Sequence, residues 1–262
     1  MKTVVCIKQV PSSTDAKIDP ETKRIIREGA KAVINPFDLY AVEEALRIRE
    51  RIGGEVIVLT MGPDNAKNSL IEALSMGADK AFLLCDRAFA GSDTWATSYA
   101  LAKAIEKIGN ADLVICGKQA VDGDTAQVGP GIASKLDMLQ AANVSGVEDI
   151  TAGEITVSRM NETGYDVLKL KLPALITVTK DINEPRIPTL RNARKARTAE
   201  ITVWKPDDID ADSDKIGLNA SPTRVVGTEP PALRNTVTLK IEGEPSQAAK
   251  KLADELINRG LI

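Results

Sequence analysis

Short apolar runs alternate with stretches of helical periodicity through the first half of the chain. Runs such as Thr3–Ile7 have the length of a buried strand, whereas Pro36–Glu50 repeats its apolar positions every three or four residues. This alternation is typical of right-handed crossover units, so we predict a doubly wound α/β fold with a mostly parallel sheet. The predicted order is strand Thr3–Ile7, helix Pro36–Glu50, strand Glu55–Thr60, helix Asp64–Met76, strand Ala81–Cys85, helix Trp95–Ile108, strand Leu113–Cys116 and helix Thr125–Leu136.

The pattern changes after about residue 140. Glu154–Arg159 and Tyr165–Leu170 each have a two-residue period, and the polar stretch Asn161–Gly164 between them is typical of a turn. We predict an antiparallel hairpin at the edge of the same sheet. Leu175–Thr179 follows as a further buried strand.

The C-terminal part of the chain lacks this alternation. Residues 205–231 are rich in Asp, Pro, Ser and Gly and show little periodicity, whereas Ser246–Asn258 has an amphipathic helical pattern. We therefore expect one α/β domain over residues 1–204. Residues 205–262 are expected to form an arm whose final helix packs on a partner protein.

Composition narrows the possible functions. The chain has 262 residues and a net charge of -3, which gives no basic stripe for nucleic acid. It contains no histidine, which excludes Ser/His/Asp and Cys/His nucleophile pairs, a histidine base and imidazole metal ligands. Cys6, Cys85 and Cys116 are far apart in apolar runs, so we expect core packing and neither a metal site nor a disulfide.

The sequence does not predict insertion into a membrane. The apolar run after Met1 is too short for a signal peptide, and no stretch approaches the roughly 20 apolar residues that cross a bilayer. We expect a cytoplasmic protein.

The segment Val114–Pro130 has the strongest features of a binding site. It leaves a predicted strand, breaks at glycines, and opens a helix for which Asp124 or Thr125 can serve as N-cap. In an open parallel sheet this is the carboxyl edge, where ligands bind and where backbone N–H groups at a helix start suit a phosphate. We expect a phosphate or diphosphate near Gly123 to Val128.

Other interpretations of this segment stay open. It matches neither a Walker loop nor the GxGxxG motif, so a plain capped turn between a strand and a helix is the alternative. The carboxylates of Asp122 and Asp124 also suit acid–base or magnesium chemistry. We favour a loop cap together with a contact to ribose hydroxyls or amides.

Several further blocks of sequence occur in an order that is typical of one protein family. They are Lys8–Pro11, Asn35–Asp38 leading into Ala41–Ala45, Ala73–Asp79, and Leu172–Val178 followed by Asn183–Arg186. Together with residues 114–130, these blocks resemble the β subunits of electron-transferring flavoproteins, and the resemblance extends along nearly the whole chain.

The resemblance implies a Rossmann-like fold that binds an adenine nucleotide. The family's binding positions follow strand ends, which agrees with the carboxyl-edge site. Pro36 and Met61 have loop stiffening and packing as equally good interpretations. The implied cofactor-binding residues are Cys6, Ile7 and Lys8; Asn35, Pro36, Phe37 and Asp38; Thr60, Met61 and Gly62; and Gly117, Lys118, Gln119, Ala120, Asp122, Gly123, Asp124, Thr125, Ala126, Gln127 and Val128.

The family divides by the ligand of this subunit. One branch keeps AMP as a structural nucleotide, and another holds a second FAD that takes electrons from NADH. Residues 122–130 resemble the second branch, since Thr125 and Gln127 offer a hydroxyl and an amide, and Gly123 lets the backbone approach a diphosphate. We favour FAD, with AMP as the alternative. No residue of the chain would itself be catalytic, because the chemistry belongs to the flavin.

The resemblance also implies partners. An α subunit with its own FAD would form an obligate heterodimer with this chain. Electrons would then pass to ferredoxin or flavodoxin and to a flavin dehydrogenase of the acyl-CoA type. Residues 185–195 resemble the family's docking segment, with Leu190 as an apolar anchor and Arg191, Arg194 and Lys195 as steering charges. A solvated basic helix start is the alternative interpretation.

A protein of another class, an ATP-binding stress-type or amidating α/β protein, should carry a glycine-rich diphosphate loop early in the chain. No such loop is visible between Val10 and Lys31. We therefore disfavour that class.

Overall fold

The computed structural model describes residues 1–12, 17–18, 25–26, 32–227 and 239–262, so most of the stretch between Val10 and Lys31 lies outside the described residues. The elements are β1 Lys2–Cys6, β2 Gln9–Pro11, β3 Lys17–Ile18, β4 Ile25–Ile26, β5 Ala32–Ile34, α1 Pro36–Ile52, β6 Glu55–Met61, η1 Asp64–Ala66, α2 Lys67–Met76, β7 Lys80–Leu84, η2 Arg87–Phe89, α3 Thr94–Ile108, β8 Leu113–Gly117, α4 Val128–Lys135, β9 Leu139–Ile150, β10 Glu154–Asn161, β11 Gly164–Lys171, β12 Ala174–Val178, α5 Leu190–Ala196, β13 Ile201–Trp204, η3 Asp207–Ile209, η4 Ser213–Lys215 and α6 Pro245–Asn258.

A nine-stranded sheet forms the framework, in the order β11-β10-β9-β12-β8-β1-β6-β7-β13. In this spatial order, all strands from β12 through β8, β1, β6 and β7 to β13 run parallel to their neighbours. Val5 of β1 lies opposite Val58 of β6 and Ile115 of β8. The predicted doubly wound, mostly parallel fold is confirmed. Because β6 and β7 extend the sheet on one side of β1 and β8 on the other, the winding reverses between β1 and β8. Open α/β sheets bind ligands at the carboxyl ends beside such a reversal.

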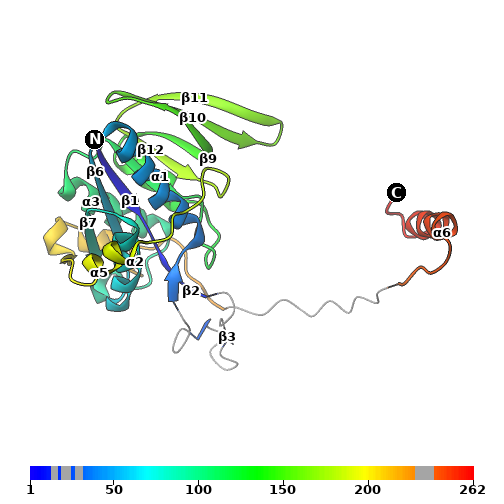
Figure 1. Ribbon diagram of the computed structural model, residues 1–262. Coiled ribbons are helices and arrows are strands. Elements are labelled where there is room, and N and C mark those ends of the chain that lie inside the picture. The colour runs from blue at the N-terminus through cyan, green and yellow to red at the C-terminus, as the bar shows by residue number, and fades with distance from the viewer. Residues whose placement is uncertain (13–16, 19–24, 27–31, 228–238) are drawn as a thin grey trace. The chain divides into compact units, whose positions relative to one another are not determined.

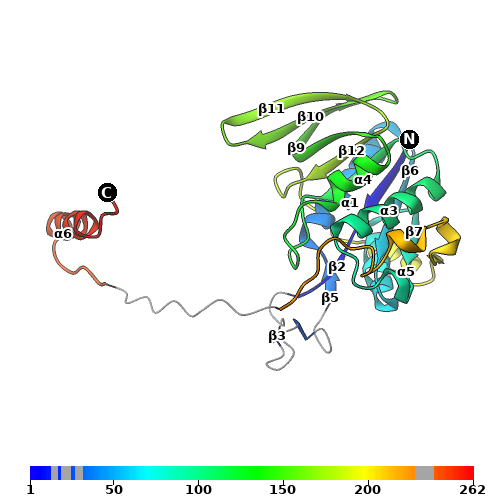
Figure 2. The same cartoon turned by 180° about the vertical axis from the view of Figure 1, so that it is seen from behind.

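Helices cover both faces of this sheet (Figures 1 and 2). Successive strand residues point to opposite faces. Val5 and Ile7 therefore pack in one apolar cluster with α1 and α2, whereas Val4 and Cys6 pack in another with α3 and α4. Burial on both faces explains why the parallel strands are continuous apolar runs without alternation.

The predicted hairpin is confirmed as β10 and β11, in which Ile155 pairs with Leu170. It forms one edge of the sheet (Figure 1). Strand β9 was not predicted, although it joins the hairpin to the parallel strands by pairing with β10 and β12. Register shifts beside β10 break its two-residue period, so the sequence lacks the alternation that would have predicted it.

Residues after β13 contact the α/β domain. Ile209 and Ile216 are buried in the apolar cluster that includes α3. The backbone N–H and hydroxyl of Thr223 donate hydrogen bonds of 3.0 and 2.8 Å to Asp93 at the start of α3. Residues 205–223 thus pack partly against the domain.

The chain divides into two compact units, Met1–Thr228 and Glu229–Ile262. In the second unit the predicted C-terminal helix is confirmed as α6, and each of its residues is at least partly exposed. Over the described ranges, no helix has the length and apolar character needed to cross a membrane.

Candidate functional site

Strand ends that the sequence singled out meet where the sheet reverses its winding. Cys6 of β1 and Cys116 of β8 lie opposite each other, and Lys8 follows the first of them. On the other side of β1, the Thr60 hydroxyl donates a hydrogen bond of 2.7 Å to the carbonyl oxygen of Ile7. The ends of β6, β1 and β8 therefore form one continuous edge.

Asp38, in the first turn of α1, is buried at this edge. Its carboxylate accepts hydrogen bonds from the backbone N–H of Lys8 at 2.7 Å, from the side-chain amide of Asn35 at 2.9 Å, and from the N–H of Gly117. Burial raises the pKa of Asp38, these donors offset part of the rise, and the resulting pKa is about 7. Asp38 thus joins the ends of β1 and β8 to the start of α1.

Asn35 connects the same helix start to residues 117–127, which we name the Gly-Lys-Gln loop. Its amide N–H group donates to the carbonyl oxygen of Gln119 at 2.8 Å, and its amide oxygen accepts from the N–H of Val121 at 3.1 Å. Asn35 is buried, and Pro36 after it suits the first position of α1, where the missing N–H is not needed.

Gly117 and Gly123 serve this loop for different reasons. A β-carbon at Gly117 would overlap the Asp38 carboxylate and the backbone and side chain of Phe37. A β-carbon at Gly123 would have the Nζ of Lys8, at 4.0 Å, as its nearest described neighbour. Internal packing therefore requires Gly117, whereas Gly123 leaves open space beside the loop that a ligand can use.

Two side-chain pairs close the outer part of the Gly-Lys-Gln loop. The Nζ of Lys8 lies 2.6 Å from the Asp122 carboxylate, and the amide of Gln119 donates to the Asp124 carboxylate. Both carboxylates therefore support the loop. Residues 123–127 are exposed beyond these pairs and can meet a ligand from solvent.

Helix α4 begins at Val128, later than the predicted start at Thr125. Asp124 and Ala126 both have φ of 54°, which is incompatible with a right-handed helix, so the prediction of Asp124 or Thr125 as N-cap is wrong. Gln127 occupies the N-cap position, and its side-chain oxygen accepts a hydrogen bond of 2.9 Å from the Thr94 hydroxyl. The first N–H groups of α4 lack intrahelical partners, as in any helix, and so suit an anionic ligand.

The structure brings the predicted cofactor-binding residues to one edge but gives them different exposures. A buried side chain can only support the site or offer its backbone to a ligand, whereas an exposed one can make side-chain contacts. Buried positions are Cys6, Ile7, Asn35, Asp38, Thr60 and Gly117; half-buried ones are Phe37, Met61, Gly62, Lys118, Gln119, Ala120, Asp122 and Val128; exposed ones are Lys8, Pro36, Gly123, Asp124, Thr125, Ala126 and Gln127.

The cysteines at this edge behave as core residues. Cys6 and Cys116 are buried, and Cys85 is half-buried. A hydrogen bond with Cys6, together with burial, raises the pKa of the Cys116 thiol. A thiol with a raised pKa is a poor nucleophile, so the arrangement does not favour covalent thiol chemistry.

Comparison with known proteins identifies the family of this chain. The family model for the electron transfer flavoprotein domain matches residues 22–209. The electron transfer flavoprotein subunit beta of Thermoanaerobacterium thermosaccharolyticum is 46% identical over 263 residues, which cover 100% of both chains. The chain belongs to the electron transfer flavoprotein β-subunit family.

Other members of this family are similarly close. The caffeyl-CoA reductase-Etf complex subunit CarD of Acetobacterium woodii is 48% identical over 236 residues, 88% of this chain and 89% of that protein. Protein FixA of Azorhizobium caulinodans is 46% identical over 266 residues, 99% of this chain and 95% of that protein. As a member of the β-subunit family, the chain is an electron-transfer protein with an α-subunit partner.

The predicted docking residues of this β subunit lie on the short helix α5. Leu190 begins that helix and is 87% exposed, and Arg191, Arg194 and Lys195 are exposed as well. The Thr189 hydroxyl caps α5 by accepting a hydrogen bond from the N–H of Asn192 at 3.2 Å. The segment therefore presents an apolar side chain beside three basic ones.

Sequence reasoning missed the contacts that hold the Gly-Lys-Gln loop and the segment around Arg186 against neighbouring helices. Glu43 is 3% exposed in the structure and contacts Arg186, although 143 residues separate them in the chain. A signal was available, because Glu43 and Glu44 interrupt a helix whose neighbouring positions Ala41, Val42, Ala45 and Leu46 are apolar. The contact of Gln127 with Thr94, which lies at the start of α3, had no such signal.

Proposed function

We propose that this β subunit binds FAD at the carboxyl ends of β1, β6 and β8 and works in the cytoplasm as half of an αβ heterodimer. The heterodimer takes electrons from NADH and divides them between ferredoxin or flavodoxin and a flavin dehydrogenase of the acyl-CoA type. The chain supplies binding and orientation, and the bound flavin would supply two-electron acceptance and one-electron release.

The observation that carries the proposal is the exposed, glycine-containing loop at the reversal of winding between β1 and β8. Gly123 leaves room beside the loop, Lys8 brings a cation to it, and the first turn of α4 adds N–H donors. A diphosphate needs this combination of space, positive charge and backbone donors. The residues present therefore fit a dinucleotide cofactor.

Individual residues have separate tasks in this proposal. Thr125 and Gln127 are exposed and offer a hydroxyl and an amide to the cofactor. Asp38 and Asn35 hold the loop in place through buried hydrogen bonds and need not touch the cofactor themselves. The carboxyl edge of the sheet thus contains residues that contact the cofactor and residues that support the loop.

Docking on the dehydrogenase is assigned to Leu190 with Arg191, Arg194 and Lys195. An exposed apolar side chain among cations provides a buried anchor and electrostatic steering in one surface. The name of the CarD relative places it in a complex with a CoA-ester reductase, which supports a partner of the acyl-CoA type.

Packing on the α subunit is assigned to the arm from residue 205 to 262. Its helix α6 has an apolar side formed by residues such as Leu252 and Ile257, which are 49% and 60% exposed. An amphipathic helix with its apolar side exposed gains stability by packing on another surface. Because β subunits of this family pair with an α subunit, the α subunit is the proposed partner of this helix.

The ligand content of the purified heterodimer tests the proposal. The chain is co-expressed with its α subunit, the nucleotides are released by acid, and FAD and AMP are counted per heterodimer. We expect FAD in both subunits and no AMP, together with NADH-dependent reduction of ferredoxin. One FAD with one AMP would instead identify a simple electron shuttle in which this subunit holds AMP as a structural ligand.

A further inference from the structure

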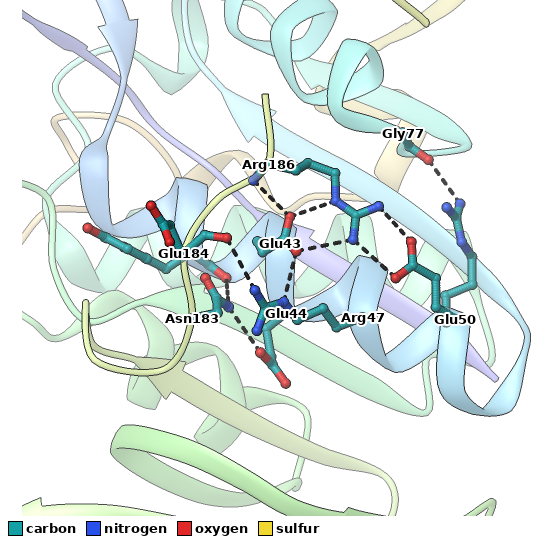
Figure 3. A network of polar contacts seen from close by, with 10 residues as sticks. Glu43, Glu44, Arg47, Glu50, Gly77, Asn183, Glu184 and Arg186 are labelled. Atoms are coloured by element: carbon teal, nitrogen blue, oxygen red, sulfur yellow. Dashed lines mark hydrogen bonds and ion pairs between the residues drawn. The ribbon is translucent and has the colours of Figure 1, made fainter. Parts of the chain in front are cut away.

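Arg186 lies between two carboxylates of α1 (Figure 3). Its backbone N–H and Nε donate to the Oε2 of Glu43 at 3.1 and 2.7 Å, and its Nη2 donates to the Oε1 of Glu43 at 3.1 Å. The guanidinium also donates to Glu50 at 2.6 and 3.2 Å. One arginine therefore makes five hydrogen bonds to a single helix.

The inner part of this contact is well shielded from solvent. The Glu43 side chain is 3% exposed, whereas Arg186 is 31% exposed and Glu50 52% exposed. Burial raises the pKa of Glu43, but hydrogen bonds from Arg186 and Arg47 lower it by more. Its pKa therefore falls below the ordinary glutamate value. Glu43 is therefore ionised at neutral pH and remains paired with Arg186.

Neighbouring residues of the same segment are held by α1 as well (Figure 3). The Arg47 guanidinium donates to the carbonyl oxygen of Glu184 at 3.3 Å. The side-chain amide of Asn183 donates to the carbonyl oxygen of Tyr40 and to the Glu44 carboxylate, both at 3.0 Å. Helix α1 thus forms hydrogen bonds with residues 183, 184 and 186.

Residues beyond these contacts project outward. Ile187 is 89% exposed and Leu190 is 87% exposed, and residues 183–189 have no regular secondary structure. Ordering such a segment costs conformational entropy, and exposing two large apolar side chains adds no burial in return. The contacts with α1 supply the stabilisation that offsets this cost.

We propose that the carboxylates of Glu43 and Glu50, acting through Arg186, hold residues 183–190 in the conformation that presents Leu190 to the dehydrogenase. Glu43, Glu50 and Arg186 are positioning residues, because they act through the loop and need not touch the partner. A preorganised loop binds more tightly because less entropy is lost when the complex forms. The inference rests on the proposed docking role of Leu190.

The test uses the complete heterodimer, with a purified short-chain acyl-CoA dehydrogenase as the probe. Rates are measured against heterodimer concentration for Arg186→Gln, Leu190→Ala and the combined variant. Each single variant should raise KM about tenfold while kcat stays within about twofold of wild type. The combined variant should be no worse than Leu190→Ala, because both changes remove the same presented anchor.

Hydrogen exchange gives a second readout that does not depend on electron transfer. The amides of residues 183–190 should exchange about tenfold faster in Arg186→Gln, with the rest of the chain and the nucleotide content unchanged. Arg49→Gln is the matched control, since Arg49 also lies on α1 and bonds to Asp79 and the carbonyl oxygen of Gly77. It should leave KM and the exchange of residues 183–190 at wild-type values.

The possible failures are distinguishable. A normal KM for Leu190→Ala would contradict the docking role itself. A raised KM for Leu190→Ala with a normal KM for Arg186→Gln would overturn only the positioning inference. Equal changes of KM and of hydrogen exchange in Arg186→Gln and Arg49→Gln would also overturn it. If Arg186→Gln fails to fold, Glu50→Gln retains the Glu43 contacts and should raise KM about threefold. An unchanged KM in that variant would also overturn the inference.

Discussion

Helix α1 supports two loops with carboxylates whose electrostatic surroundings are opposite. At its start, Asp38 is buried among neutral donors, and its pKa is raised to about 7. Five residues later, Glu43 is equally buried, but its donors are the guanidinium groups of Arg186 and Arg47, and its pKa is lowered.

This difference shows that burial alone does not decide the charge of a carboxyl group. Neutral N–H donors and the charge of Lys8 offset only part of the desolvation cost at Asp38, whereas two guanidinium groups more than offset it at Glu43. The carboxyl edge around Asp38 should therefore respond to pH near neutrality. The segment that Glu43 holds through Arg186 should respond only in acid.

The largest expected effect concerns the pH dependence of stability at Asp38. Its folded pKa of about 7 lies above the unfolded value, so its contribution to stability is present at low pH and is lost as pH rises toward 7. The loss amounts to about 4 kcal/mol between pH 4 and pH 8. In Asp38→Asn, which cannot titrate, this part of the pH dependence should be missing.

Denaturant unfolding of wild type and Asp38→Asn at a series of pH values measures the difference directly. Parallel pH profiles for the two proteins would show that Asp38 keeps an ordinary pKa. The contrast with Glu43 would then disappear.

Exchanging glycine for alanine at the two loop positions should separate support from ligand contact. Gly117→Ala should cost about 3 kcal/mol of unfolding free energy, because the new methyl group overlaps Asp38 and Phe37. Gly123→Ala has open space and should leave the unfolding free energy of the nucleotide-free chain unchanged while lowering nucleotide retention. Thermal unfolding and acid-released nucleotide content measure the two effects. Equal stability losses would contradict the division.

Removing the charge of Glu43 should have a moderate effect. Glu43→Gln is expected to lose about 1.5–3 kcal/mol of unfolding free energy at neutral pH, because charge-assisted hydrogen bonds to Arg186 are weakened. Since the folded pKa of Glu43 is lowered, the wild-type contribution persists above the ordinary glutamate pKa and disappears as pH falls below it. Unfolding of the variant should therefore depend less on pH in that acid range. A loss confined to pH near 7 would contradict the assignment.

The smallest change in stability is expected at Lys8. Its ion pair with Asp122 is 47% exposed on the lysine side, so Lys8→Gln should alter the unfolding free energy by less than about 1 kcal/mol. If Lys8 assists the diphosphate, nucleotide affinity should nevertheless fall about tenfold. Titration of the nucleotide-depleted heterodimer with FAD tests this. An unchanged affinity would assign Lys8 to loop closure alone.

Local patterns in the sequence were sufficient for most of the framework. Continuous apolar runs predicted all the parallel strands from β12 to β7 in the sheet order, a two-residue period predicted β10 and β11, and an amphipathic pattern predicted α6. These predictions succeeded because neighbouring residues carry the signal. Ordered blocks such as Lys8–Pro11 and Asn183–Arg186 were enough to indicate the family.

The elements that sequence reasoning missed depend on contacts that no local pattern contains. Strand β9 follows an irregular register, and β13 is a short edge strand paired with β7. Helix α4 starts late because Asp124 and Ala126 adopt positive φ values. None of these features follows from apolar periodicity.

By itself the sequence determined most of the elements and the family, and it predicted the loops that a cofactor should contact. Only the tertiary structure decided which groups meet there. It set Gly117 against Asp38 and Arg186 against Glu43, across 79 and 143 positions of the chain. A carboxyl group has the same intrinsic chemistry in both places, but folding selects its solvent exposure and the charge of its neighbours. These long-range choices make one acid titrate near neutrality and keep the other ionised.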